Sequence, residues 1–206
     1  MKKTATKKKI LSVAVFCSGQ GTNLQAILDA CRRGKISARV VVVIVDNASA
    51  LAISRAQKAG VPVVFVDPAQ CPSRAQYGKV LAAATARFKP DLIALAGFMR
   101  ILSPSFVRRY KGKIINIHPA LLPAFPGAHA VRDALAAGVK TTGVTVHFVD
   151  EQVDHGPVIA QRPIPVKRSD TEETLLRRLH RAEHQLYPEV IQQIARTGSN
   201  KRVRSK

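Results

Sequence analysis

The order of apolar and amphipathic segments predicts an α/β fold: a doubly wound, mostly parallel sheet of about seven strands with helices on both faces. Short apolar runs alternate with amphipathic stretches along almost the whole chain. The run at 38–46 is nearly all β-branched, which is typical of a strand buried on both faces. The last two apolar runs have no helical stretch between them, so one of these strands is expected to be antiparallel.

In the first half of the chain, each expected strand is followed by an expected helix. The segment 10–19 is an apolar run that turns polar and glycine-rich, and 23–34 has the apolar spacing of an amphipathic helix ending at Gly34. After the strand at 38–46 comes a helix at 48–60, for which Gly60 is a suitable C-terminal cap. A third strand follows at 61–67.

The second half continues the alternation and then departs from it. Residues 73–88 are expected to form a helix that Ser73 can cap, since serine side chains accept hydrogen bonds from first-turn amides. The remaining expected elements are strands at 91–97 and 113–118, a short helix at 127–138, strands at 141–150 and 156–166, and a helix from 171 to about 195.

Size and composition indicate one domain. The chain has 206 residues, 46% of them hydrophobic, which is enough for a large core. We expect the domain to cover residues 10–196, between basic tails at 1–9 and 197–206. No apolar stretch is long enough to span a membrane, and no apolar signal core follows the basic start, so a cytoplasmic protein is expected.

The formal net charge of +20 is partly a property of the tails. Without the nine basic residues of the tails, 24 basic and 13 acidic residues remain, a net charge of +11. That excess suits anionic small-molecule substrates, which a positive field attracts. A nucleic-acid partner is not expected, because the chain contains no RNA- or DNA-binding motif.

A metal site is not expected either. The cysteines Cys17, Cys31 and Cys71 are scattered, with no C-x-x-C spacing, which also argues against a disulfide framework. Five histidines, His129, His147, His155, His180 and His184, lack the spacing of metal ligands. The one exception is a weak pair, His180 and His184, four residues apart on an expected helix.

The segment 18–24, "SGQGTNL", joins the first expected strand to the first expected helix. Glycines permit a tight turn there, and the helix N-terminus offers free N–H groups to an anion. The dinucleotide fingerprint would need glycine at position 24, which is leucine, and the Walker A lysine is absent. The segment is therefore either a phosphate site without a dinucleotide or a glycine turn with no ligand.

The segment 95–102, "LAGFMRIL", follows the fourth expected strand. Gly97 would end the strand, and Phe98 and Met99 are apolar side chains at a place where solvent or ligand is expected. They would form either part of a ligand site or a small hydrophobic cluster beneath a loop.

The segment 114–127, "IINIHPALLPAFPG", places two polar side chains at the carboxyl end of a buried strand. Asn116 and His118 are two residues apart and so share a face. An amide and an imidazole can stabilise an oxyanion and move a proton. Three prolines, at 119, 123 and 126, are expected to stiffen the loop that follows.

The segment 149–159, "VDEQVDHGPVI", is an acidic loop in a basic protein. Asp150, Glu151 and Asp154 are all candidates to orient His118, and their spacing does not decide among them. A carboxylate beside an imidazole favours its charged form. The alternative is a solvated hairpin with acids that face water.

Taken together and in order, long stretches of residues 10–195 resemble the phosphoribosylglycinamide formyltransferase family, the folate-dependent enzymes of purine synthesis. The resemblance rests on "SGQGTNLQAILDA", "LAGFMRILSPSFV", "NIHPALLPAFPGAHA", "GVTVHFVDEQVDHGPVI" and "EHQLYP". It implies a Rossmann-like formyltransferase fold. The implied reaction passes a formyl group from the co-substrate 10-formyltetrahydrofolate to the amine of glycinamide ribonucleotide.

The resemblance also implies roles for individual residues. Asn116 would donate a hydrogen bond to the formyl oxygen, His118 would stabilise the oxyanion as a cation and donate a proton, and Asp154 would raise the pKa of His118 and order a proton-carrying water. The implied ribonucleotide site comprises Gly21, Thr22, Asn23 and Glu183, the first three at the phosphate. The implied folate site comprises Met99, Arg100, Ile101 and Leu102, with Asn116 beside it and Arg74 near the folate tail.

Some features lie outside the family pattern or favour other functions. Gln20 and Thr22 stand where Asn and Ser are common in the family, and both keep the loop polar. Formyltetrahydrofolate deformylase and methionyl-tRNA formyltransferase share the Asn-x-His and a later Asp, but each normally carries another domain. A basic nucleic-acid-binding module is the non-enzymatic alternative. The sequence leaves the choice of monomer or homodimer open.

Overall fold

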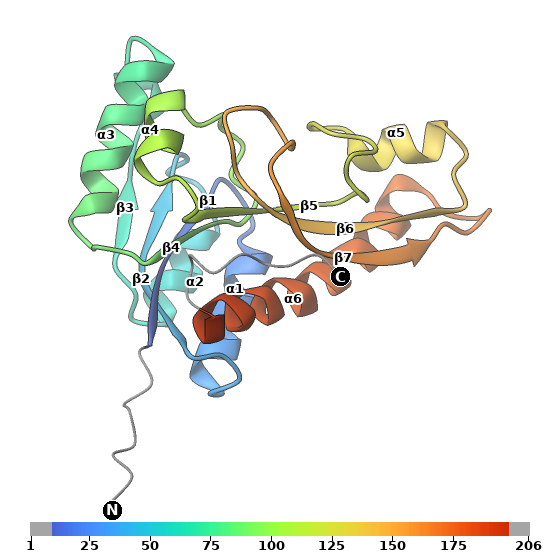
Figure 1. Cartoon of the computed structure of the whole chain (residues 1–206), viewed down its shortest axis with the longest axis horizontal. Coiled ribbons are helices and arrows are strands. Elements are labelled where there is room, and N and C mark those ends of the chain that lie inside the picture. Colours follow the sequence, from blue (N-terminus) through green and yellow to red (C-terminus); the bar gives the residue numbers. More distant parts are fainter. Residues whose placement is uncertain (1–9, 198–206) are drawn as a thin grey trace, which may run out of the picture.

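The computed structural model describes residues 10–197, which form one seven-stranded sheet with helices on both faces (Figure 1). The strands are β1 (Leu11–Cys17), β2 (Ala38–Val45), β3 (Val63–Phe65), β4 (Leu92–Leu95), β5 (Ile114–His118), β6 (Thr141–Phe148) and β7 (Val158–Pro165). The helices are α1 (Thr22–Arg32), α2 (Ala52–Lys58), α3 (Arg74–Ala86), α4 (Pro104–Arg109), α5 (Ala130–Ala136) and α6 (Glu172–Thr197), with a 3₁₀ turn η1 (Pro68–Gln70).

The sheet has the doubly wound topology that the sequence predicts. Its strand order is β3-β2-β1-β4-β5-β6-β7. The strands β1 to β5 are parallel, β6 is antiparallel to β5, and β7 is antiparallel to β6. The expectation that one of the last two strands runs antiparallel is therefore confirmed, and β6 is that strand.

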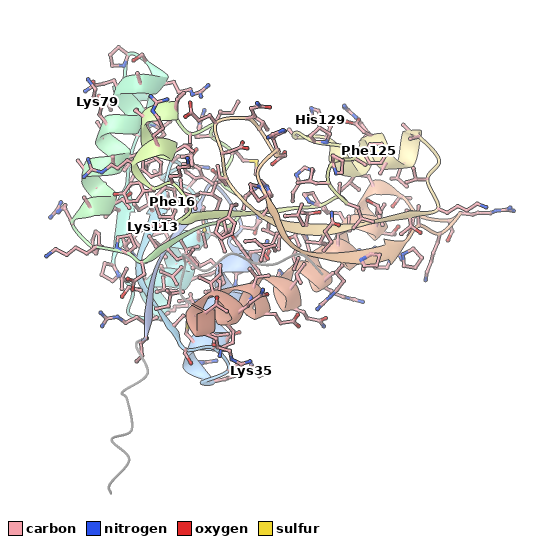
Figure 2. All side chains as sticks on the ribbon, in the orientation of Figure 1. Phe16, Lys35, Lys79, Lys113, Phe125 and His129 are labelled. Atoms are coloured by element: carbon pink, nitrogen blue, oxygen red, sulfur yellow. The ribbon has the colours of Figure 1, made fainter. Side chains whose placement is uncertain are left out.

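Strand β1 lies at the centre and supplies side chains to two hydrophobic cores. Val13 and Val15 pack into the core shared with α1, α2 and α6. Ala14 and Phe16 point to the other face and pack with α3 and α4 (Figure 2 labels Phe16). Because every residue from Val13 to Cys17 is fully buried, β1 shows no polar alternation, as expected for a strand covered on both faces.

The helix α4 is the element that the sequence reasoning missed. The Ser103 hydroxyl caps it by accepting a hydrogen bond from the Phe106 amide at 3.3 Å, and Pro104 occupies its first turn. Both features are ordinary helix-start signals. With six residues, however, α4 is too short to show a helical period in its apolar residues.

The boundaries of α1, α3 and α6 agree with expectation to within two residues, whereas α2 and α5 begin four and three residues later than expected. The Ser73 hydroxyl caps α3 by accepting from the Gln76 amide at 3.1 Å. The helix α6 continues to Thr197, one residue beyond the domain boundary expected at 196. The tails predicted at 1–9 and 197–206 lie outside the described residues, apart from Thr197. Within residues 10–197, every helix is too short or too polar to cross a membrane.

Candidate active site

The segments that the sequence singled out lie at one edge of the sheet. The loop 18–21 follows β1, the loop 96–103 follows β4, and β5 ends at His118. These three strands are neighbours, and their carboxyl ends point the same way because they are parallel. The chain order reverses between β1 and β4, which is where open α/β sheets bind ligands.

Asn116 and His118 converge on Asp154, as their shared face on β5 predicts. The amide nitrogen of Asn116 donates to Asp154 Oδ1 at 3.2 Å. His118 Nδ1 lies 3.3 Å from Asp154 Oδ2. His118 is buried, with 4% of its surface exposed, so this pairing lies largely out of water. The amide, the imidazole and the carboxylate thus form one cluster.

Both ring nitrogens of His118 face hydrogen-bond acceptors. Nε2 lies 2.8 Å from the carbonyl oxygen of Phe125, and Nδ1 faces the Asp154 carboxylate. A carbonyl and an ionised carboxylate can only accept, so a ring that donates at both nitrogens carries both protons. Phe125 and Asp154 therefore hold the His118 ring from both sides.

The carboxyl group of Asp154 is held in its ionised form. Burial alone would raise its pKa, but the His147 ring, the Gly127 amide and the His118 ring together lower the pKa to about 2. The Gly127 amide donates to Asp154 Oδ2 at 2.9 Å. The backbone at Asp154 has a φ of 52°, a left-handed conformation that non-glycine residues rarely adopt and that is often found at functional sites.

The geometry distinguishes the three acids that the spacing left open. Asp150 pairs with His155 at 2.9 Å, and Glu151 pairs with Arg108 at 2.9 Å. Of these three acids, only Asp154 contacts His118. The structure thus places beside His118 the acid that the family resemblance implied.

His147 is a member of the cluster that the sequence reasoning missed. It pairs directly with Asn116 across β5 and β6, and its Nε2 lies 3.3 Å from the Asn116 amide nitrogen and 3.6 Å from Asp154 Oδ1. Its Nδ1 lies 2.9 Å from the Phe148 carbonyl, which can only accept, so Nδ1 carries a proton. The alternation along β6 could have indicated its face, but the partner strand and register could not be read from the sequence.

In the loop 18–21, the backbone carbonyls are hydrogen-bonded to other parts of the protein, whereas, among residues 10–197, most of the backbone amides are free. The carbonyls of Ser18, Gly19, Gln20 and Gly21 accept from Asn47, Ala52, Arg55 and Gln25 respectively. In contrast, within the part of the chain that the structure describes, the amides of residues 19–24 donate to no acceptor. Unpaired amides at a helix N-terminus form an anion site.

Gly21 is required by the conformation of this loop. Its φ of 67° lies in the left-handed region, and a Cβ atom there would lie 2.9 Å from both Cα and Cβ of Ala52. Any side chain at position 21 would therefore push the loop away from α2.

Asn23 and Glu183 form a buried pair beside this loop. The Asn23 amide donates to Glu183 Oε2 at 2.7 Å, and Glu183 is only 4% exposed. Burial raises the pKa of Glu183 to about 7, although the hydrogen bond from Asn23 lowers it. One helical turn later, the buried Tyr187 hydroxyl lies 2.8 Å from the Leu95 carbonyl and 3.1 Å from that of Ile115, which fixes α6 against β4 and β5.

The loop after β4 brings together the residues assigned to a folate site. The Arg74 guanidinium donates to the Leu102 carbonyl at 3.0 Å, and Arg100 pairs with the buried Asp46 at 2.7 Å. Met99 and Ile101 are largely exposed, at 72% and 56%. Two apolar side chains in solvent at a ligand-binding edge are consistent with a surface that a flat, partly apolar molecule covers.

This loop is tied to the loop after β1. The Met99 amide donates to the Ser18 hydroxyl at 2.8 Å, and the Ser18 amide donates to the Gly97 carbonyl at 3.0 Å. The loop expected to bind phosphate and the loop expected to bind folate therefore share a rigid connection through Ser18.

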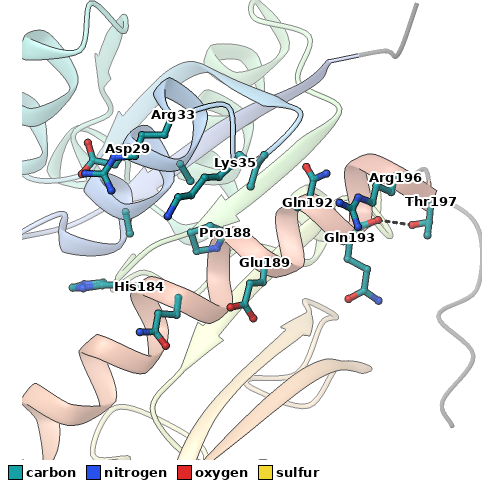
Figure 3. A pocket seen from close by; sticks show the side chains of 14 residues that line it. Asp29, Arg33, Lys35, His184, Pro188, Glu189, Gln192, Gln193, Arg196 and Thr197 are labelled. Atoms are coloured by element: carbon teal, nitrogen blue, oxygen red, sulfur yellow. Dashed lines mark hydrogen bonds between the residues drawn. The ribbon is translucent and has the colours of Figure 1, made fainter. Parts of the chain in front are cut away.

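A separate groove of about 620 Å³ lies between α1 and α6, away from this edge (Figure 3). Its lining includes Lys35, His184 and Arg196, and it contains none of Asn116, His118 and Asp154. Among residues 10–197, no group of His, Cys, Asp and Glu side chains has the arrangement of a metal site.

An α/β sheet with an amide-lined loop and an Asn–His–Asp cluster at its carboxyl edge is the arrangement of a doubly wound enzyme. Residues 11–191 match the family model described as formyl transferase. The chain belongs to the formyl transferase family.

Relatives and solved structures agree with this assignment. The chain is 48% identical over 186 residues to the phosphoribosylglycinamide formyltransferase of Mycobacterium tuberculosis (strain H37Rv), which covers 90% of this chain and 86% of the relative. It is 43% identical over 203 residues to the trifunctional purine biosynthetic protein adenosine-3 of Bos taurus, and spans 97% of this chain but only 20% of that protein. Glycinamide ribonucleotide transformylase 1 from Symbiobacterium toebii superposes with a TM-score of 0.91 at 46% identity, covering 95% and 92% of the two chains.

Proposed function

We propose that this chain transfers the formyl group of 10-formyltetrahydrofolate to the amine of glycinamide ribonucleotide, a step of purine biosynthesis that yields formylglycinamide ribonucleotide and tetrahydrofolate. The observation that carries the proposal is the convergence of Asn116 and His118 on Asp154 at an edge that also presents free amides. The names of relatives that match most of their own length support the same reaction.

The reaction forms one bond and breaks another at the formyl carbon. The amine nitrogen of the ribonucleotide bonds to that carbon, and the bond from the carbon to the folate nitrogen breaks. A proton leaves the amine, and one reaches the folate nitrogen. Negative charge develops on the formyl oxygen, so donors placed there lower the barrier.

In the proposed mechanism, Asn116 and His118 are these donors. The imidazolium of His118 supplies charge and a proton, while Asp154 keeps the ring oriented and balances its charge. In the structure, Nε2 of His118 donates to the Phe125 carbonyl, and both hydrogens of the Asn116 amide face His147 and Asp154. The formyl oxygen must therefore replace one acceptor of each donor.

The two substrates would occupy the two loops joined by Ser18. The amides at Gly21, Thr22 and Asn23 would hold the ribonucleotide phosphate, and Glu183 would contact the same molecule. The folate would lie along Met99, Arg100, Ile101 and Leu102, beside Asn116, with Arg74 near its tail. We place this reaction in the cytoplasm, with no metal ion and with a monomer or homodimer as the working form.

The test is to follow an isotopically labelled formyl group to its acceptor. Purified protein is given labelled 10-formyltetrahydrofolate with glycinamide ribonucleotide or with methionyl-tRNA, and products are identified by mass. We expect label in formylglycinamide ribonucleotide alone. Label in free formate would instead indicate water as the acceptor, and label on methionyl-tRNA would indicate the tRNA enzyme; either result would overturn the proposal.

A further inference from the structure

Arg55 lies on α2, behind the loop that presents its free amides. Its Nε donates to the Gln20 carbonyl at 2.8 Å, and its NH1 group donates to Gln25 Oε1 at 3.2 Å. It therefore joins α2 to the loop and to the first turn of α1 through two hydrogen bonds that use the fork of the guanidinium.

This contact determines where the Gly21 amide points. In a trans peptide unit, the C=O and the following N–H lie in one plane and point in opposite directions. Because Arg55 holds the Gln20 carbonyl on the α2 side, the Gly21 amide is turned to the other side. The same reasoning applies to Ala52, whose amide holds the Gly19 carbonyl at 3.1 Å and so orients the Gln20 amide.

Arg55 is the strongest side-chain anchor of this loop. The other side-chain anchor, Asn47, donates to the Ser18 carbonyl at 3.4 Å, close to the limit for a hydrogen bond. The other two carbonyls of the loop accept from the backbone amides of Ala52 and Gln25, and Ser18 is also tied to Gly97 and Met99. A charged donor forms a stronger hydrogen bond than a neutral amide.

We propose that Arg55 is a positioning residue for the substrate phosphate: it sets the loop 18–21 so that the amides of residues 21–23 meet the phosphate at no cost in reordering. The inference rests on the proposed function, because it assigns the phosphate of that substrate to this loop. Arg55 acts through the backbone and does not itself contact the reacting atoms.

Three variants separate positioning from charge. Arg55→Ala removes both hydrogen bonds and one charge, and Arg55→Lys keeps the charge but loses the fork. Arg32→Ala is the matched control, since Arg32 carries the same charge on α1, is exposed, and among residues 10–197 pairs only with Asp29, at 3.2 Å. It lies ten residues beyond Thr22, about 15 Å along the helix.

The measurement is the affinity for ribose 5-phosphate and for glycinamide ribonucleotide by calorimetry, together with steady-state kinetics for each substrate. For Arg55→Ala we expect affinity for both phosphate compounds to fall about tenfold and the KM for the ribonucleotide to rise by a similar factor. The kcat and the KM for 10-formyltetrahydrofolate should stay within about twofold, with Arg55→Lys intermediate and Arg32→Ala unchanged.

Several results would overturn the inference. Unchanged phosphate affinity in Arg55→Ala would show that the loop holds its shape without the contact. Normal affinity in Arg55→Lys, or an equal loss in Arg32→Ala, would show that charge alone is responsible. If the wild-type chain bound ribose 5-phosphate but did not formylate the ribonucleotide, the proposed function would fail, and the loss of ribose 5-phosphate binding in Arg55→Ala would still support the role of Arg55.

Discussion

Asp154 connects more polar groups of the candidate site than any neighbouring acid. Its two oxygens contact Asn116, His118 and the Gly127 amide, and His147 lies close by. The low pKa means that this carboxylate keeps its charge at neutral pH, so it can balance an imidazolium through the whole reaction.

Removing the imidazole should therefore abolish most of the activity. For His118→Ala we expect kcat to fall by about 10² to 10⁴, because general acid catalysis and charge stabilisation are lost together. Asp154→Asn should lower kcat as well, since the neutral amide cannot balance the charged ring. Steady-state turnover with both substrates saturating measures both effects.

Asp150→Asn is the control for this pair, because Asp150 lies in the same loop and pairs with the exposed His155. It should keep near-normal turnover. Wild-type kcat in a folded His118→Ala variant would show that the imidazole has no role in the reaction.

The buried carboxyl group of Glu183 should make the stability of the protein depend on pH. Its pKa rises from 4.5 to about 7 on folding, chiefly through burial. A group whose pKa is raised in the folded state contributes stability fully below its unfolded pKa, and that stability is lost as pH rises through the folded pKa. The wild-type protein should thus lose stability between about pH 4.5 and 7, because Glu183 ionises in the unfolded chain while it stays protonated in the folded one.

Glu183→Gln keeps a neutral side chain at every pH. The difference in unfolding free energy between this variant and the wild type should be small at pH 5 and should grow in favour of the variant toward pH 8, by a few kcal/mol at most. Urea denaturation at several pH values measures it. A difference that does not change with pH would mean that Glu183 ionises as an exposed acid does.

Some members of the candidate site could be predicted from the sequence, and others could not. The pairing of Asn116 with His118 followed from the two-residue period of a strand. The choice among Asp150, Glu151 and Asp154 depended on how a loop folds back, which spacing does not encode. His147 depended on the register of β6 against β5, a long-range feature.

At the scale of elements, the loop after β4 is fixed by an asymmetric ion pair. The side chain of Asp46 is 2% exposed, and that of Arg100 is 52% exposed. Asp46 Oδ1 has no partner among the described residues, so Arg100 is the main compensation for a buried charge. A buried charge left without its partner is strongly destabilising.

The two halves of this pair should therefore respond differently to substitution. Arg100→Ala leaves the carboxylate buried and unpaired. We expect it to lower the free energy of unfolding by about 1 to 3 kcal/mol, a range that allows for the exposure of the arginine. Asp46→Asn leaves only an exposed cation and should cost less. Thermal unfolding of the two variants gives the comparison, and an equal or reversed order would contradict it.

Helices and strands were predicted well where the apolar pattern extends over many residues and less well where it covers only a few. The expected strands at 10–19 and 38–46 correspond to β1 and β2, since continuous apolar runs are typical of central strands. The six residues of α4 carry capping signals but no period, and β3 shrank to three residues from an expected seven. Edge strands end where pairing ends, which depends on the neighbouring strand.

At the scale of the whole molecule, the net charge of +11 outside the tails suits a protein with two anionic substrates. Lys35, Lys79 and Lys113 are exposed, and the first two lie at the periphery in Figure 2. Such a field raises the encounter rate of anions without contacting them. It does not by itself indicate nucleic acid, and the sequence predicted an anionic small-molecule substrate for this reason.

The stoichiometry of the reaction distinguishes formyl transfer to the ribonucleotide from formyl transfer to water. Purified protein is mixed with excess 10-formyltetrahydrofolate and a limiting amount of glycinamide ribonucleotide, and tetrahydrofolate release is followed by absorbance until it stops. We expect one tetrahydrofolate to be released per ribonucleotide added, and none without it. Release that continues after the ribonucleotide is consumed, or that begins in its absence, would contradict the account, because water would then be the acceptor.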